Sequence, residues 1–421
     1  MVRYAISTLE EFDINTLRVL LINQIYSKQT NTPLLLRVED IQNKDEEKQK
    51  QIMEILNLFS IEYSQILEQK NNFKYHQQIA MQLLVDKKSF NCFCSDETLE
   101  EEKTKAKENK SEYFYNDFCQ TLHDETVLNV NAPFRVRIKK STQNIAFNDL
   151  VKSNQTFTPN QIDSVIILNQ DKTPTLTFAN GVDDMLSNVS VVIRDDKFLS
   201  SSAREIYIRE QIGYTQEITY AHIPSVVSNE KILIKALIDE GFLPAAIANY
   251  LIYLGIETPH KFFTIEEAVG WFDISKVKSD ISKFDIEELK IFNQHYIQEM
   301  EDLRLSKILS YADDDIGKLA KVFAKDTSSI HEIKNKIDLI FTSKATPEKY
   351  AEEFTQIKEF LSDAPFIEDY DELKTYITLQ LGYKADSLNV PLQYLLLGQN
   401  IKIDMDEVYP YIRNYLGEII C

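Results

Sequence analysis

A strand–helix–strand pattern at the start of the chain constrains the fold more than any other feature. Residues 2–6 form a short apolar run, residues 17–25 place apolar side chains on one helical face, and residues 34–38 form a second apolar run. This order predicts one βαβ unit, whose crossover should be right-handed and whose strands should be parallel. The pattern indicates the first half of a doubly wound α/β fold.

A second stretch, residues 173–213, is the centre around which we expect the chain to be organised. Residues 176–179 and 189–193 are predicted strands separated by polar turns. A helix is predicted to begin at the serines 200–202, with Glu205 just inside it. The last strand ends in Arg194. Open α/β sheets bind their ligands at the carboxyl ends of strands, so Arg194 is a candidate ligand-binding residue.

Composition narrows the class of protein. The 421 residues predict roughly two to four domains. The sequence has no apolar run of membrane-spanning length, and its first residues lack the order of a signal peptide, so we expect a cytoplasmic protein without a membrane partner. A net charge of −20 argues against binding of nucleic acid by the whole surface, although it leaves room for a local basic face. Only 9 glycines leave few positions for phosphate-cradling loops.

Several segments follow the sequence patterns of one enzyme family. They are residues 3–21 (RYAISTLEEFDINTLRVLL), 35–40 (LLRVED), 174–200 and 220–224 (YAHIP). Together they resemble glutamyl-tRNA synthetases, which are class I aminoacyl-tRNA synthetases, and the resemblance extends over nearly the whole chain. It implies an α/β fold with a Rossmann-type parallel sheet and an α+β insertion, followed by all-α helical domains.

The resemblance also implies domain boundaries. Residues 1–79 and 177–226 would form the two Rossmann halves, and residues 80–176 the insertion that meets the acceptor end of tRNA. Residues 227–305 would form a stem-contact domain, and residues 306–421 a helical domain like those that bind the anticodon. The last of these segments is helical by pattern, with breaks near its prolines.

The family's glutamate site is largely kept. By resemblance, Glu39 would hold the amino group of glutamate and Arg3 and Arg194 would face its carboxylates, while Ser7 and Asn180 would add hydrogen bonds. Charge-assisted hydrogen bonds are the strong ones, which suits such a site. Leu176 stands where the family has a tyrosine. The alternative is that these residues form only an ion-pair network at the strand ends.

The ATP-binding signatures of the family are altered. Its His-Ile-Gly-His motif is replaced by Asp13, Ile14, Asn15 and Thr16, which places an acid where the triphosphate would lie. The segment after Pro224 is shorter than the family's lysine-bearing loop, whose cations neutralise pyrophosphate. Asp13 has a second interpretation, as the N-cap of a helix.

Three of the four cysteines lie near one another in sequence. Cys92 and Cys94 form a Cys-x-Cys pair, Cys119 follows, and His123 lies four residues later. Intracellular cysteines in this pattern favour tetrahedral zinc over a disulfide. The arrangement resembles the zinc knuckle of some glutamyl-tRNA synthetases, and Asp117 or water could replace His123. The alternative is three thiols without metal.

Close to this cluster, residues 134–139 form a predicted strand, and the basic side chains there are Arg135, Arg137, Lys139 and Lys140. By resemblance it would be a basic patch facing the acceptor arm of tRNA. An edge strand protected by its charges is the alternative.

The altered signatures predict a glutamyl-tRNA synthetase-like pseudo-enzyme, impaired in ATP-dependent activation of glutamate. It would act by binding L-glutamate, tRNA held weakly, another synthetase or an amidotransferase. The alternative is an active glutamate–tRNA ligase, which would use ATP and Mg²⁺, with divergent motifs. A third hypothesis is transfer of glutamate to an acceptor other than tRNA. Loss of cations at a transferring phosphoryl group is costly, which is why the impaired form was preferred.

Overall fold

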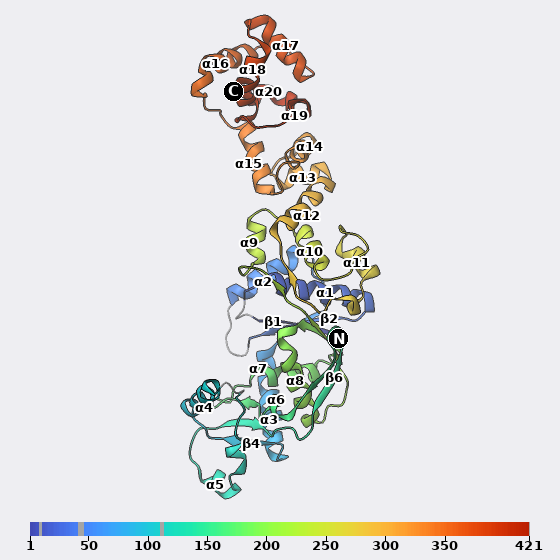
Figure 1. Cartoon of the computed structure of the whole chain (residues 1–421), viewed down its shortest axis with the longest axis vertical. Helices are drawn as coiled ribbons and strands as arrows, with labels where there is room; N and C mark the ends of the chain where they lie inside the picture. Colours follow the sequence, from blue (N-terminus) through green and yellow to red (C-terminus); the bar gives the residue numbers. More distant parts are fainter. Residues whose placement is uncertain (8–10, 41–45, 110–112, 421) are drawn as a thin grey trace. The chain divides into compact units, whose positions relative to one another are not determined.

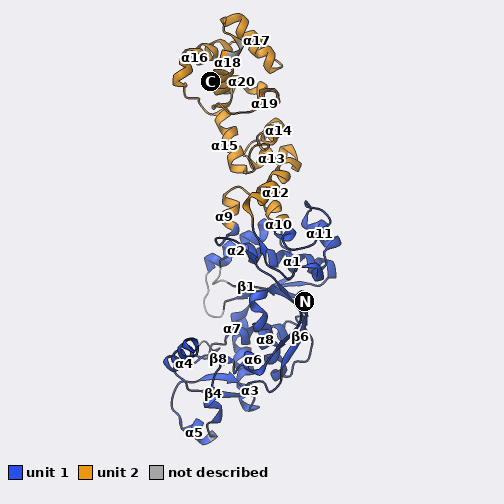
Figure 2. Ribbon diagram, viewed as in Figure 1, with its two compact units in different colours: residues 1–234, 251–284 blue, residues 235–250, 285–421 orange. Residues whose placement is uncertain are grey.

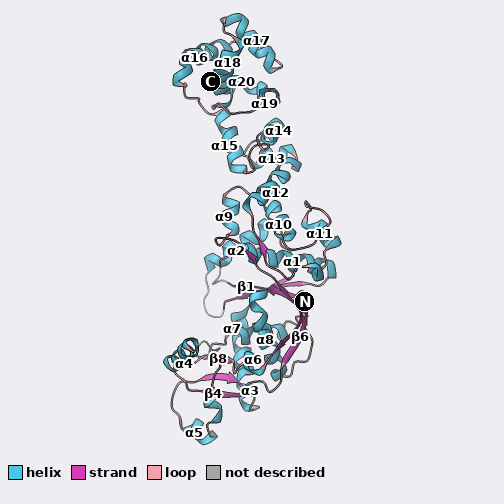
Figure 3. Cartoon of the chain, viewed as in Figure 1, coloured by secondary structure: helices cyan, strands magenta, loops and turns pink. Residues whose placement is uncertain are grey.

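The chain forms two compact units. The computed structural model describes residues 1–7, 11–40, 46–109 and 113–420. Residues 1–234 and 251–284 form the first unit, and residues 235–250 and 285–421 belong to the second (Figure 2). Within the described residues, every strand lies in the first unit, as the magenta arrows of Figure 3 show. The helices of this described part are too short or too polar to cross a membrane. The finer division into five domains stays a prediction.

The first unit is built on a seven-stranded sheet of order β3-β2-β1-β9-β10-β6-β7. Its strands are β1 (Val2–Ser7), β2 (Leu34–Glu39), β3 (Gln65–Glu68), β6 (Ile145–Asp149), β7 (Ser153–Phe157), β9 (Val191–Asp195) and β10 (Thr219–Ile223). All neighbouring pairs are parallel except β6 and β7, which form an antiparallel hairpin at one edge. The predicted parallel α/β sheet is therefore confirmed.

Helices cover both faces of this sheet. The helix α1 (Ile14–Thr30) connects β1 to β2, and α8 (Leu199–Ile212) connects β9 to β10. From the centre of the sheet these crossovers run in opposite directions, so right-handed connections place their helices on opposite faces. Figure 1 shows α1 on one side of β1 and β2, with α7 and α8 on the other. The strand order reverses between β1 and β9, which is where open sheets bind ligands.

The structure corrects two predictions in the central stretch. Residues 176–179 are not a strand but the first turn of α7 (Leu176–Leu186), because Phe178, Ala179 and Val182 form one buried helical face. A short apolar run cannot distinguish a strand from a helix by periodicity. The helix α8 begins at Leu199, inside which the serines 200–202 lie. The N-cap of α8 is Phe198, which makes no side-chain cap hydrogen bond, whereas Asp195 caps the preceding 3-10 turn η3 (Asp196–Phe198) by accepting from the N–H of Lys197.

The region before the insertion combines helices with one strand of the main sheet. It contains α2 (Glu46–Leu58), then β3 and the 3-10 turn η1 (Gln69–Asn72), and then α3 (Phe73–Val85). The strand β3 was missed because it is short and its first residues are exposed at the sheet edge, so its sequence lacks a buried apolar run.

The insertion is a three-stranded antiparallel sheet with short helices. The order is β4-β5-β8, from β4 (Ser89–Cys92), β5 (Arg135–Ile138) and β8 (Ile166–Leu168). The helices are α4 (Asp96–Glu108), capped by Ser95, the 3-10 turn η2 (Phe118–Thr121), α5 (Asp124–Asn129) and α6 (Pro159–Ile162). Because β5 is the central strand, Arg135 and Arg137 are buried. Neither the basic patch nor the protected edge strand is therefore correct for these two arginines.

The rest of the chain is mainly helical. It begins with the short strand β11 (Val226–Val227), which pairs with β12 (Ser282–Lys283), and includes the 3-10 turn η4 (Ile274–Lys276). The helices up to residue 323 are α9 (Ile234–Asp239), α10 (Pro244–Tyr253), α11 (Ile265–Trp271), α12 (Ile286–Glu299), α13 (Asp302–Ile308) and α14 (Asp314–Phe323). Those that follow are α15 (Ile330–Phe341), α16 (Ala351–Leu361), α17 (Tyr370–Leu381), α18 (Ala385–Leu397), α19 (Met405–Ile412) and α20 (Leu416–Ile420), with 3-10 turns η5 (Glu348–Tyr350) and η6 (Arg413–Tyr415). The predicted helical carboxyl-terminal segment is confirmed for its described residues.

Candidate active site

A cavity of about 280 Å³ lies where the strand order of the sheet reverses. Residues at the carboxyl ends of β1 and β9 line it, together with the amino-terminal turns of α1 and α7. The structure brings all five residues of the predicted glutamate site to this cavity: Arg3, Ser7, Glu39, Asn180 and Arg194. Leu176 also lines it. The cavity is therefore the candidate active site.

The side chain of Arg3 is fixed by a buried acid, Asp184. Its guanidinium donates two hydrogen bonds of 3.1 Å to the carboxylate of Asp184 on α7. Arg37 on β2 donates to the same carboxylate at 2.5 Å. Burial opposes ionisation of Asp184, but Arg3, Arg37 and Arg209 outweigh it and hold the pKa of this carboxyl well below its usual range. The position of Arg3 is thus fixed by a carboxylate that stays charged.

Arg194 is fixed in a similar way by α8. Its two terminal nitrogens donate to the two carboxylate oxygens of Glu205, each at 3.0 Å. Ser202 accepts two further hydrogen bonds from Arg194, one of them from Nε at 3.1 Å. Glu205 also lies 3.9 Å from Arg3, so one acid links the two arginines. Such bidentate pairs fix a guanidinium in both position and orientation.

Glu39 and Asn180 form the opposite part of the cavity. The two side chains are hydrogen bonded, and Arg37 approaches Glu39 at 3.9 Å. Burial raises the pKa of Glu39 above its ordinary value, although Arg37 and Arg3 counteract the shift. The amide of Gln69 donates to Asn180 at 2.8 Å and to Asp183 at 3.0 Å. Asn180 is therefore oriented by a second buried acid of α7.

The altered signature residues lie at the start of α1. Asp13 caps this helix, because its side chain accepts hydrogen bonds from the backbone N–H and the hydroxyl of Thr16, both at 2.9 Å. Asp13, Asn15 and Thr16 line the cavity, whereas Ile14 is 2% exposed and belongs to the core. The capping interpretation of Asp13 is confirmed.

Asn15 has a contact that the sequence did not reveal. Its carboxamide donates to the carbonyl of Val226 at 3.0 Å and accepts from the N–H of Val226 at 2.7 Å. The backbone around Asp13 also pairs with residues 232–234, through hydrogen bonds of 3.2 Å from Ile14 and 3.1 Å to Phe12. The short segment after β10 is therefore attached to the start of α1.

Acidic groups outnumber basic ones around the cavity. Five acids line it, namely Glu11, Asp13, Glu39, Asp195 and Glu205, whereas its basic lining residues are Arg3, Arg194 and Lys197. Both arginines are already paired with buried carboxylates. The cavity thus offers guanidiniums in fixed positions for carboxylates, but its described lining has no surplus of positive charge for phosphates.

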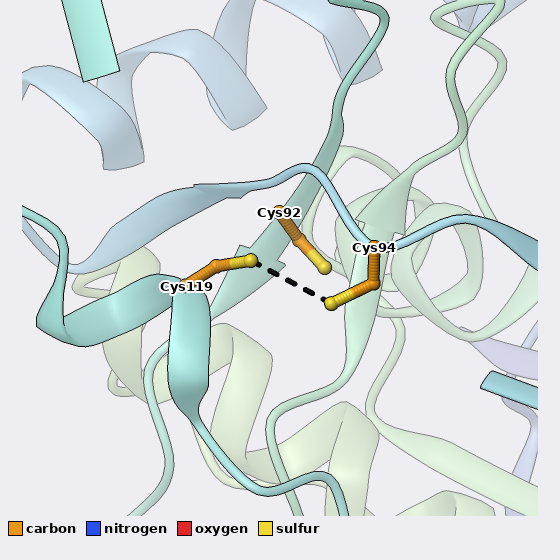
Figure 4. A group of neighbouring side chains, drawn as sticks. All are labelled: Cys92, Cys94 and Cys119. Atoms are coloured by element: carbon orange, nitrogen blue, oxygen red, sulfur yellow. Dashed lines mark hydrogen bonds between the residues drawn. The ribbon is translucent and has the colours of Figure 1, made fainter. Parts of the chain in front are cut away.

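The three cysteines converge in the insertion (Figure 4). The Sγ atoms of Cys92, Cys94 and Cys119 lie within 4.8 Å of one another, and those of Cys94 and Cys119 are 3.6 Å apart. The hydroxyl of Tyr115 lies 3.4 Å from both Cys92 and Cys94. His123 is exposed and, among the described residues, does not belong to this group of donor atoms.

Neighbouring side chains enclose the cysteine group. Arg137 donates to Cys92 at 3.4 Å and lies over the ring of Tyr115, 3.9 Å from its centroid. Asp117, considered as a substitute ligand, accepts a hydrogen bond from Ser164 instead. Three thiols and a phenol oxygen at these separations suit a tetrahedral metal site with sulfur ligands.

Sequence reasoning missed the residues that support the site. Asp183 and Asp184 are fully buried, although their roles in holding Gln69 and the arginines had no counterpart in the predicted site. Two adjacent acids inside an apolar helical segment were the available signal, because buried acids need charged or hydrogen-bonding partners. Ser202 and His222 gave no comparable signal.

Comparisons with known proteins agree with this geometry. The family model of class I tRNA synthetases (E and Q), catalytic domain, matches residues 1–291. A protein of Sulfurimonas denitrificans named glutamate–tRNA ligase 2 is 41% identical and covers 100% of both chains. A protein of Campylobacter jejuni named glutamate–tRNA ligase 1 is 38% identical over 100% of this chain and 99% of its own.

Solved structures support the fold. The crystal structure of a glutamate tRNA ligase from Elizabethkingia meningosepticum, in complex with its amino acid, matches with a TM-score of 0.82 and 20% identity, covering 100% of this chain and 98% of that one. The glutamate-tRNA synthetase of Elizabethkingia anophelis gives a TM-score of 0.81 at 20% identity and the same coverage. With the family model and the full-length relatives, these findings show that the chain belongs to the glutamyl-tRNA synthetase family, with a class I catalytic domain.

Proposed function

We propose that the protein is a glutamate–tRNA ligase, which joins L-glutamate to tRNA with consumption of ATP. The observation that carries this proposal is the convergence of Arg3, Ser7, Glu39, Asn180 and Arg194 on one cavity at the reversal of strand order. The full-length relatives named glutamate–tRNA ligases support it. They give no support to our prediction of an impaired enzyme, so the alternative of an active ligase is preferred.

The roles of the side chains follow from their charges. Arg3 and Arg194 would donate to the two carboxylates of glutamate, since each guanidinium has N–H groups beyond those used by its own acid. Glu39 would accept from the ammonium group, and Asn180 and Ser7 would complete its hydrogen bonds. Glutamine lacks the second carboxylate, so a site with two arginines in fixed positions would favour glutamate.

Mg²⁺–ATP would supply the adenylyl group that activates the carboxylate of glutamate. Asp13, Asn15, Thr16 and Lys197 line the part of the cavity near the start of α1. Helix starts favour anions, yet Asp13 already accepts the hydrogen bonds available from Thr16 there. The described lining therefore fits the amino acid better than it fits a triphosphate.

A second candidate function is binding of glutamate without its activation. The attachment of Asn15 to Val226, together with the acidic rim of the cavity, specifically favours this candidate. Adenylation transfers a charged phosphoryl group, and loss of one oriented donor at such a group costs roughly 10²-fold to 10³-fold in rate. The two candidates share the glutamate site, and only the ligase activates glutamate with ATP and transfers it to tRNA.

Exchange of pyrophosphate into ATP separates the two candidates. The purified chain is assayed with L-glutamate and total tRNA, and binding of glutamate and of ATP is measured by calorimetry. The test variant is Glu39→Gln, which keeps the shape of the site, and the control is the exposed Glu62→Gln. The ligase is supported if the wild type and Glu62→Gln catalyse the exchange and Glu39→Gln does not. Glutamate binding without exchange supports the second candidate, and absence of both contradicts the two.

We infer in addition that the insertion holds a structural zinc ion. Cys92, Cys94 and Cys119 would provide three sulfur ligands, and Tyr115 is the oxygen donor in position to complete the set. Zinc would stabilise this part of the chain by crosslinking β4 to η2. The proposed fourth ligand differs from the predicted His123, which stays outside the group.

A further inference from the structure

A chain of buried polar side chains runs from Arg194 to the far side of β10. Ser202 Oγ, which accepts from Arg194, lies 2.7 Å from Nε2 of His222. The other ring nitrogen, Nδ1, lies 2.6 Å from the carboxylate of Asp149 at the end of β6. Ser202 and His222 are fully buried and Asp149 is 2% exposed. Arg194 is the one member of this chain that lines the cavity.

Donor and acceptor chemistry fixes the protonation of this chain. The guanidinium of Arg194 can only donate, so Ser202 Oγ accepts its hydrogen bonds and has its own proton left to donate. The acceptors near that proton are Nε2 of His222, at 2.7 Å, and the carbonyl of Phe198, at 3.4 Å, and the much shorter contact favours Nε2 as an unprotonated acceptor. The proton of the neutral ring then lies on Nδ1 and is donated to Asp149. The structure thus assigns one tautomer to His222.

Asp149 is itself held by the backbone. One of its carboxylate oxygens accepts from the N–H groups of Val151 at 2.9 Å and Lys152 at 2.8 Å. The N–H of His222 adds a third such hydrogen bond, at 3.2 Å. Burial opposes ionisation of Asp149, but the hydrogen bonds from His222, Lys152 and Val151 together outweigh it and lower the pKa of Asp149 below its usual value. A charged acid that cannot rotate therefore forms the base of the chain.

The surroundings of His222 favour its neutral form. The charged groups that face the ring are Asp149 on β6, Arg194 on β9 and Glu205 on α8. Burial lowers the pKa of His222, and Arg194 acts in the same direction, against the two acids. A protonated ring would present an N–H to Ser202 and leave the serine proton without its 2.7 Å acceptor. Protonation would therefore disturb the contact that orients Arg194.

We propose that Asp149, His222 and Ser202 are positioning residues that orient the guanidinium of Arg194 toward a substrate carboxylate. This inference rests on the proposed function, because it takes glutamate as the ligand of Arg194. The Ser–His–Asp order also occurs in hydrolases, but here the Oγ of Ser202 is buried and occupied by Arg194, so it cannot reach a substrate as a nucleophile. The chain acts through Arg194 and not on the substrate.

Substitutions in full-length protein test this role through the affinity for L-glutamate. Ser202→Ala and His222→Asn each interrupt the chain and should weaken binding about tenfold, since hydrogen bonds to a charged group are lost. His222→Gln can place an amide oxygen near the position of Nε2 and should recover most of the affinity. The matched control is Tyr207→Phe on the same helix as Ser202, which removes a partly buried hydrogen bond of 2.7 Å to the backbone carbonyl of Lys139.

The dependence on pH distinguishes positioning from mere stabilisation. Acidification should weaken glutamate binding in the wild type through both Glu39 and His222, whereas His222→Gln should retain only the part due to Glu39. On the wild type, nitrogen NMR of the histidines should show an Nδ1–H neutral ring for His222, identified by its absence in His222→Gln. This measurement does not depend on whether Ser202→Ala and His222→Asn fold.

The outcomes separate the two proposals. A wild type that does not bind glutamate overturns the proposed function and, with it, the role of the chain. A wild type that binds, with Ser202→Ala and His222→Asn equal to Tyr207→Phe in affinity, overturns the inference alone. An Nε2–H tautomer of His222 also overturns it. Tenfold weakening, recovery in His222→Gln and the Nδ1–H tautomer together support it.

Discussion

Replacement of Asp184 by asparagine is the sharpest test of what holds the first unit together. The carboxylate of Asp184 is fully buried and receives hydrogen bonds from Arg3 at 3.1 Å and from Arg37 at 2.5 Å. Arg209 lies 3.7 Å away. Asp184→Asn keeps the volume of the side chain but leaves the buried guanidiniums without the acid that they share. The amide N–H groups of the new asparagine would also face the N–H groups of these guanidiniums.

The expected cost is large because a buried charge loses its partner. Breaking such a pair destabilises by about 3–5 kcal/mol. With an m-value of about 3 kcal/mol/M for a unit of this size, the urea midpoint should fall by about 1–1.7 M. The chain has a single tryptophan, Trp271, which lies in α11 of the first unit, so its fluorescence follows the unfolding of that unit.

The control and the pH dependence make the test specific. Glu62→Gln removes an exposed pair of 2.8 Å with Lys28 and should shift the midpoint by less than about 0.3 M. Since the folded-state pKa of Asp184 lies below its unfolded value, its stabilisation is fully present above about pH 4 and decreases on acidification below it. The difference between Asp184→Asn and wild type should therefore shrink below about pH 4. Equal midpoints for the two variants at pH 7 would refute the reasoning.

Three further predictions concern other parts of the first unit. Arg18→Met should lower the free energy of unfolding by about 3 kcal/mol in the urea experiment, because three backbone carbonyls, of Pro224, Leu251 and Leu254, lose their donor. Asn15→Ala removes both hydrogen bonds to Val226, so limited proteolysis of residues 225–233 should accelerate up to about 30-fold, and an unchanged rate would contradict the attachment. Elemental analysis should find zinc in wild type and in His123→Ala but not in Cys94→Ser, and loss of zinc in His123→Ala would restore the predicted ligand.

The sequence was sufficient for the parts of the fold that have strong periodicity. The strands β1 and β2 with α1 between them were predicted within a few residues, because a buried parallel strand is a nearly continuous apolar run. The strand prediction for residues 176–179 was wrong, because four residues are too few to show a periodicity that distinguishes a strand from the first turn of α7. The prediction that Arg137 is exposed was wrong, because it rested on charge alone and strand order is a tertiary property.

The candidate site was accessible from sequence only in part. The resemblance named the residues that now line the cavity, such as Arg3 and Glu39. It could not show that Arg194 is paired with Glu205, or that Asp184 holds Arg3, since those contacts join residues far apart in the chain. A donor set assembled from spacing alone likewise selected His123, whereas the fold brings Tyr115 to the thiols.

The segment after β10 is attached to the start of α1 by two sets of neighbouring contacts. The carboxamide of Asn15 satisfies both polar groups of Val226, and the backbone of Phe12 and Ile14 pairs with residues 232–234. Contacts that share one segment are not independent, because each holds the backbone in the position that the other needs. Loss of the Asn15 side chain should therefore also weaken the pairing of residues 232–234, and its cost in stability should exceed that of the two hydrogen bonds to Val226 alone.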